Sequence, residues 1–244
     1  MDYPIPPIQG VILYRRDVVV VRSRGYRTSG VPPRGEVTEF SWDSRKRLAF
    51  VACNTDVVFN TLITLTYPAA FPSNGKTVKK HFHAFLEWLA RDLGGRPSYL
   101  WFLEFQKRGA PHYHLLIDWR LPKARRSVTE FRFRLSSAWY RIVGSGDPKH
   151  LAAGTRSESV RLRDGAARYA VKYATKMRQK VVPADYRNVG RFWGCSRDVI
   201  PVPRKTLRCT EDDVRGALEG WEFAPSPDRP VYKVLYGRAD AFDR

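Results

Sequence analysis

Two strand-like runs joined by a short loop constrain the fold of this chain more than any other feature. Residues 99–105 form one apolar run, residues 106–111 contain glycine and proline, and residues 112–118 form a second apolar run. This pattern predicts an antiparallel β-hairpin. The second run contains His112 and His114, and alternate side chains of a strand point to one face. The sequence therefore predicts a sheet that presents two imidazoles on the same face.

Two imidazoles on one face of a strand are suited to binding a single divalent cation, with Glu104 as a third ligand. The simplest hairpin register places Glu104 opposite Tyr113, on the wrong face. A one-residue shift, or a bulge near Gly109, places Glu104 beside His112 instead. The alternative interpretation is that the histidines are structural and that Glu104 is a carboxylate at the rim of the sheet.

A second His-x-His pattern, His81 and His83, serves as an internal control. It lies within residues 76–93, where apolar residues recur at helical spacing. Side chains two positions apart on a helix diverge by roughly 200°. This pair is therefore predicted to lie on the surface and not to share a metal ion.

The rest of the chain mixes further strands and helices. Strands are predicted over residues 11–22, 61–67, 158–162, 192–199 and 231–236, and helices over residues 76–93, 129–143, 166–181 and 211–219. Strands interleaved with helices at hairpin spacing predict an α+β fold with a central antiparallel sheet and flanking helices. We divide the chain into an N-terminal extension (1–45), a central domain (46–202) and a C-terminal tail (203–244).

The charge of the chain indicates its partner. Lys and Arg total 43 against 24 Asp and Glu, which gives a net charge of +19. Such a charge on a globular chain favours a polyanionic partner, most often nucleic acid, over the alternatives of a ribosome-like or membrane-surface protein.

Two further features of the sequence indicate where the protein acts. No apolar run approaches the roughly 18 residues of a membrane span, and the N-terminus has no signal-peptide pattern. Three widely spaced cysteines, Cys53, Cys195 and Cys209, suggest reduced thiols. We therefore expect a cytoplasmic protein without a membrane partner.

Two tyrosines in the predicted helix 166–181 are candidate nucleophiles. Tyr169 and Tyr173 are four residues apart and project together from a helix, and Lys172 and Lys176 follow them at three residues each. A phenolate beside a metal-bound phosphate can attack phosphorus, while an ammonium stabilises the negative charge. The alternative interpretation is an aromatic stripe that packs into the core.

Three segments occur in the order of the three motifs of rolling-circle replication initiators, the HUH-type single-strand endonucleases. They are residues 61–68, residues 104–114 and residues 169–176. The paired tyrosines are similar to those of small single-stranded-DNA phage replication proteins, and residues 191–197 resemble a segment downstream of the tyrosines in phage members. The resemblance covers about residues 58–200.

This resemblance implies a ferredoxin-like HUH endonuclease domain with Mn²⁺ or Mg²⁺ bound by His112, His114 and Glu104. One tyrosine would nick an origin strand and become linked to the 5′ phosphate, and the free 3′ hydroxyl would prime synthesis. The second tyrosine would then attack the regenerated origin and close a circle. Tyr173 is favoured as the first nucleophile, because single-tyrosine relatives keep the later position. The implied partners are single-stranded DNA, origin duplex DNA, and the host helicase and polymerase, in a bacterial host cytoplasm.

Basic residues around these motifs are predicted to hold DNA. They are Lys107, Arg108, Arg168, Arg178 and Lys180, besides the two lysines that follow the tyrosines. Trp101, Trp119 and Trp193 are candidate stacking partners for unpaired bases, with core or rim packing as the alternative.

Two rival functions remain open. An HUH transposase or relaxase would share the chemistry, although the third histidine or N-terminal nucleophile of a relaxase is not evident. A DNA-binding protein could also use the fold without catalysis. The intact histidine and tyrosine pairs argue against this second rival.

Overall fold

The computed structural model describes residues 8–15, 17–22, 39–160, 182–208, 210 and 232–236. The chain divides into two compact units, one of residues 1–34, 49–56 and 200–244, the other of residues 35–48 and 57–199. Each unit is described by itself. Among the described residues, no helix is both long enough and apolar enough to cross a membrane.

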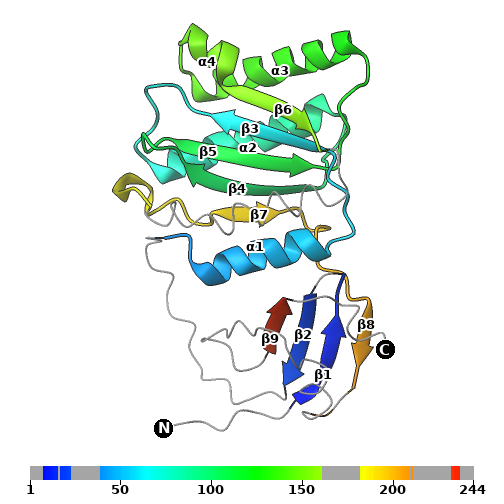
Figure 1. Cartoon of the computed structure of the whole chain (residues 1–244). Helices are drawn as coiled ribbons and strands as arrows, with labels where there is room; N and C mark the ends of the chain where they lie inside the picture. Colours follow the sequence, from blue (N-terminus) through cyan, green and yellow to red (C-terminus); the bar gives the residue numbers. More distant parts are fainter. Residues whose placement is uncertain are drawn as a thin grey trace. The chain divides into compact units, whose positions relative to one another are not determined.

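The larger unit is built on an antiparallel sheet with the strand order β6-β3-β5-β4-β7 (Figure 1). Its strands are β3 (Thr61–Thr66), β4 (Tyr99–Phe105), β5 (Pro111–Ile117), β6 (Thr155–Ser159) and β7 (Trp193–Cys195). Its helices are α2 (Gly75–Asp92), α3 (Arg125–Val143), the short α4 (Pro148–Ala153) and the 3₁₀ turn η2 (Ala184–Tyr186). The predicted α+β fold with a central antiparallel sheet and flanking helices is confirmed.

One face of this sheet packs against helices and forms the hydrophobic core. The strand residues in the core have odd numbers, as Tyr113, Leu115 and Ile117 of β5 illustrate, because side chains alternate along a strand. The helices contribute apolar stripes at helical spacing. These stripes are Val78, Phe82, Phe85, Leu86 and Leu89 of α2, and Phe131, Leu135 and Trp139 of α3. Each fully buried Leu or Phe stabilises the fold by about 1.5–3 kcal/mol, so this face holds the unit together. The even-numbered residues are left on the opposite face.

The start of α2 is fixed to the segment that precedes β7. Asn74 caps the helix by accepting a hydrogen bond from the Lys76 amide at 2.8 Å. Gly75 follows, and its amide donates to Oδ1 of Asn188 at 3.1 Å. A Cβ atom at Gly75 would lie 2.7 Å from the Val189 backbone, so only glycine permits this approach.

The smaller unit contains a second antiparallel sheet, with the strand order β8-β1-β2-β9. Its strands are β1 (Ile8–Leu13), β2 (Asp17–Arg22), β8 (Lys205–Leu207) and β9 (Tyr232–Tyr236). The strands of the predicted N-terminal extension and C-terminal tail therefore pair with one another. Helix α1 (Trp42–Asn54) contributes residues to both units.

Candidate functional site

The turn between β4 and β5 sets the register of the hairpin. The Gln106 amide donates to the Ala110 carbonyl at 2.9 Å, and the Gly109 amide donates to the Gln106 carbonyl at 2.8 Å. Gly109 has a φ of 80°, which is the left-handed residue that a three-residue hairpin loop requires. As a result Glu104 pairs with His112. The simplest register, with Glu104 opposite Tyr113, is wrong, and the alternative with a shift at Gly109 is correct.

This register gathers polar residues on the sheet face opposite the core. Glu104, His112 and Thr66 form one row across three neighbouring strands. His114 and Thr64 belong to the next row, two residues along. The three predicted metal ligands therefore lie on one face of adjacent strands.

The two histidines and Glu104 are close together and are held from behind. Nε2 of His114 lies 3.3 Å from Oε2 of Glu104, and the rings of His112 and His114 have centroids 4.6 Å apart. Nδ1 of His112 lies 3.0 Å from the Thr66 hydroxyl, and Nδ1 of His114 lies 3.4 Å from the Thr64 hydroxyl. The side chains of His114 and Glu104 are only 5% and 11% exposed. Since each Nδ1 faces a threonine, each Nε2 lies on the side of its ring away from that hydroxyl.

The His114–Glu104 spacing fits two donors that share one cation. Donors about 2.0–2.1 Å from a metal, at angles between octahedral and tetrahedral, are about 3.0–3.4 Å apart. A second hydrogen bond from the ring of a metal-ligating histidine is also the usual arrangement. Among the described residues, no group of three or more His, Cys, Asp or Glu side chains is already arranged to hold a metal ion. The fit therefore rests on the His114–Glu104 pair and on the donor chemistry, with His112 on the same face.

Thr66 is anchored by residues that the sequence did not single out. Its carbonyl accepts hydrogen bonds from Trp139 Nε1 and from His150 Nε2, both at 2.9 Å, and its amide donates to the Gly154 carbonyl at 2.8 Å. Because a carbonyl only accepts, Nε2 of His150 carries the proton. Nδ1 therefore accepts from the Ser145 hydroxyl at 2.8 Å. His150 is buried, and this burial lowers its pKa, so the neutral ring is favoured. His150 and Trp139 thus position the threonine that faces His112.

The predicted DNA-binding residues of the hairpin turn differ in their surroundings. Lys107 is exposed. The Arg108 guanidinium donates to the carbonyls of Tyr67 and Pro68, each at 2.6 Å, and lies 5.1 Å from the centre of the Phe71 ring. Arg108 therefore ties the turn to the segment that follows β3, and its role in DNA binding stays a prediction.

The three candidate stacking tryptophans occupy different environments. Trp101 is buried in the core, with the Lys79 ammonium 3.8 Å from its ring centre. Trp193 is half-buried and donates to the Ser44 hydroxyl at 3.0 Å. Trp119 is half-buried beside Phe131, with the ring centroids 4.7 Å apart. Core packing is thus the correct interpretation for Trp101.

The control histidines are also placed. Both lie in α2, as expected, and His83 is exposed. His81 is half-buried and its Nδ1 lies 3.2 Å from the Tyr67 hydroxyl, so the surface prediction was wrong for His81.

The remaining predicted site residues lie outside the described part of the chain. They are the nucleophile candidates Tyr169 and Tyr173, the lysines Lys172 and Lys176, and the basic residues Arg168, Arg178 and Lys180.

Comparison with known proteins agrees with a role in handling DNA. An antiparallel sheet with two histidines and a carboxylate on one face, in a strongly basic chain, is typical of a nucleic-acid-processing protein. Residues 60–178, just under half of the chain, match a family model of replication-associated proteins, the family that includes the ORF2 replication protein. This match supports a replication-initiator family and a role in DNA replication. Searches of curated proteins and of solved structures returned no match.

Proposed function

We propose that the protein initiates rolling-circle replication by nicking and rejoining one DNA strand at an origin, as HUH-type endonucleases do. The observation that carries this proposal is the placement of Glu104, His112 and His114 on one face of two paired strands. The match over residues 60–178 supports the replication role and includes both tyrosine candidates.

The residues of this face fit a divalent metal, Mn²⁺ or Mg²⁺. Nε2 of His112, Nε2 of His114 and the Glu104 carboxylate would hold it. When bound, the metal would polarise the phosphoryl oxygens of the DNA. Short, paired strands keep the ligands rigid, and the low exposure of His114 and Glu104 limits competition from water.

The proposed nucleophile is Tyr173, with Tyr169 acting in the second step. The phenolate oxygen attacks the phosphorus, a P–O(Tyr) bond forms, and the bond from phosphorus to the 3′ oxygen breaks. The leaving 3′ oxygen takes up a proton. Attack by a 3′ hydroxyl on the phosphotyrosine reverses the exchange and rejoins the strand. Lys172 and Lys176 stabilise the charge on the phenolate or the phosphate.

A nicking assay tests this mechanism. A supercoiled plasmid that carries the origin is incubated with the protein and Mn²⁺ or Mg²⁺. The wild type is expected to give open circles and a protein–DNA adduct that resists SDS. The double variant Tyr169→Phe, Tyr173→Phe should bind DNA but form no adduct. An adduct formed by the double variant would show that the nucleophile assignment is wrong.

The ligand assignment has a matched control within the chain. His112→Gln and His114→Gln should each abolish nicking and weaken Mn²⁺ binding measured by calorimetry. His83→Gln removes an exposed histidine from α2 and should change neither. Equal behaviour of all three variants would exclude the proposed site.

The same assays separate the rival functions. A non-catalytic DNA-binding protein would bind the origin without nicking it. A relaxase or transposase would form the adduct on a transfer origin or a transposon end rather than on a replication origin.

A further inference from the structure

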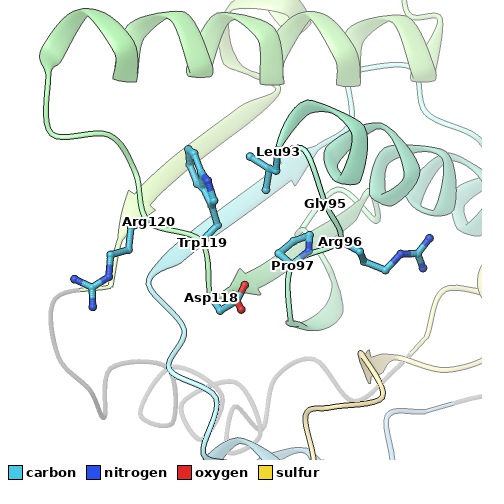
Figure 2. Close-up of a pocket in the computed structure, with 7 residues that line it drawn as sticks. All are labelled: Leu93, Gly95, Arg96, Pro97, Asp118, Trp119 and Arg120. Atoms are coloured by element: carbon cyan, nitrogen blue, oxygen red, sulfur yellow. The ribbon is translucent and has the colours of Figure 1, made fainter.

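A shallow pocket of about 400 Å³ lies where β4 begins and β5 ends, at the opposite end of these strands from Glu104 and His112 (Figure 2). It lies between the turn after α2, around Arg96 and Pro97, and the segment after β5, around Trp119 and Arg120. No motif of the sequence and no part of the proposed nicking site accounts for this pocket.

Apolar groups line one part of the pocket. Figure 2 shows the Trp119 ring beside Leu93, with Pro97 near the centre of the view. Trp119 is held in place, because its ring packs on Phe131 and its carbonyl accepts a hydrogen bond from the Thr61 hydroxyl at 2.7 Å. A fixed, half-exposed indole next to a proline is a suitable surface for a flat aromatic ring.

Positive charge flanks these apolar groups. Arg96 and Arg120 extend from opposite sides of the pocket (Figure 2). Arg96 pairs with Glu87 at 2.6 Å, but both side chains are more than half exposed, so the pair is weak and exchangeable. Asp118 is the carboxylate among the lining residues.

The basic segment, residues 120–126, continues from the pocket into α3. Arg120, Lys123 and Arg125 are exposed and have no acidic partner among the residues that the structure describes. The nearby carboxylate of Asp92 already pairs with Arg134 at 2.8 Å. The pocket rim therefore carries positive charge that this part of the protein does not neutralise.

The stability of α3 does not explain this charge. The helix begins at Arg125, its first turn contains no acidic residue, and Ala124 provides no side-chain cap. Cations in the first turn oppose the helix dipole. A charge placement that disfavours the local structure is expected where a partner uses it.

We propose that the pocket and the basic segment bind a second part of the DNA strand. An unpaired base lies on Trp119, and the phosphates on either side of it contact Arg96 and Arg120. Stacking on an indole beside cations is the usual mode of single-strand binding. The proposal rests on DNA being the partner but not on the nicking chemistry.

The spacing of the two sites predicts a length dependence. His112 and Asp118 are six residues apart on one strand, which is about 20 Å. At about 3.4 Å per nucleotide, one DNA strand needs roughly six nucleotides to span this distance. A strand much shorter than this cannot reach both sites.

Fluorescence anisotropy with labelled single-stranded DNA tests the proposal, in EDTA so that no nicking occurs. Trp119→Leu keeps an apolar contact with Phe131, and it should weaken binding of a long oligonucleotide by about 5- to 150-fold, the effect of losing one stacked base. Arg120→Gln should lower the salt slope of binding by about one. The control Lys149→Gln removes an exposed cation from α4 and should leave the affinity near the wild-type value. Circular dichroism melting checks that each variant is folded.

The outcomes are distinct from those of the nicking test. Wild-type affinity in both Trp119→Leu and Arg120→Gln overturns the proposal, and so does a loss no greater than that of Lys149→Gln. An equal loss on duplex DNA or on RNA also overturns it, because the surface would then not be specific for a DNA single strand. Loss of single-strand affinity in these variants, with nicking of a short oligonucleotide retained, supports it. Failure of the tyrosine variants to abolish the adduct would leave this result unaffected.

Discussion

The hydroxyl of Thr66 is expected to control the metal affinity of the proposed site. It lies 3.0 Å from Nδ1 of His112, whereas the Thr64 hydroxyl lies 3.4 Å from Nδ1 of His114. The first contact has the length of a normal hydrogen bond, and the second is near its limit. Because the amide and carbonyl of Thr66 are both hydrogen-bonded to other segments, this residue cannot move to restore a lost contact.

The change Thr66→Val removes this hydroxyl and keeps the branched shape that suits a strand. Loss of a hydrogen bond that orients a ligating histidine typically costs about 10- to 100-fold in metal affinity, or about 1.4–2.8 kcal/mol. Thr64→Val should cost less than about tenfold, because its contact is longer. The free energy of unfolding without metal should fall by only about 0.5–1.5 kcal/mol in either variant.

Calorimetric titration with Mn²⁺ at one pH measures the affinity, and urea unfolding in EDTA measures the stability. Wild-type Mn²⁺ affinity in Thr66→Val would refute the argument that the threonine orients His112. A larger loss in Thr64→Val than in Thr66→Val would show that the two hydrogen-bond distances do not rank the two contacts.

Three further predictions concern the framework around the site. Gly75→Ala should lower the free energy of unfolding by about 1–3 kcal/mol, because a Cβ atom would lie 2.7 Å from the Val189 backbone, whereas Gly95→Ala meets no atom within 4 Å and should be near neutral in urea unfolding. Arg108→Lys should cost about 1 kcal/mol of stability through its lost carbonyl contacts. It should leave the salt slope of DNA binding unchanged, and a lower slope would mean that Arg108 contacts phosphate directly. Burial, with a smaller effect of a neighbouring arginine, lowers the pKa of Lys79 to about 7. Above that pH the unfolded chain binds more protons than the folded chain, so the unfolding free energy should rise from pH 7 to pH 10, by less than about 1.4 kcal/mol per pH unit because Lys79 is only half-buried. Lys79→Met should abolish this rise, and a rise that persists in the variant would assign it to other groups.

The main elements of the larger unit followed from periodicity. The helix predicted over residues 76–93 is α2, at Gly75–Asp92, and the strand predicted over residues 99–105 is β4, with the same bounds. These elements have one apolar side that repeats at the period of a helix or a strand. Helix α1 had no such signal, because residues 48–53 are a continuous apolar run that suits either structure.

Non-local pairing could not be predicted from the sequence. Strands β1 and β8 pair across nearly the whole chain, and nothing in either short segment specifies its partner. The surroundings of the site pose the same problem. The period of two placed His112 and His114 on one face, but Thr66 lies 46 residues from His112 and His150 lies 84 residues from Thr66.

The face on which Glu104 lies depends on a single turn residue. In β4 and β5 the odd positions form the core and the even positions form the proposed site. A loop one residue shorter would pair Glu104 with Tyr113 and move its carboxylate out of the histidine row. The left-handed conformation of Gly109 permits the three-residue loop that prevents this. A glycine that is remote from any chemistry thus determines whether the carboxylate can act together with the two histidines.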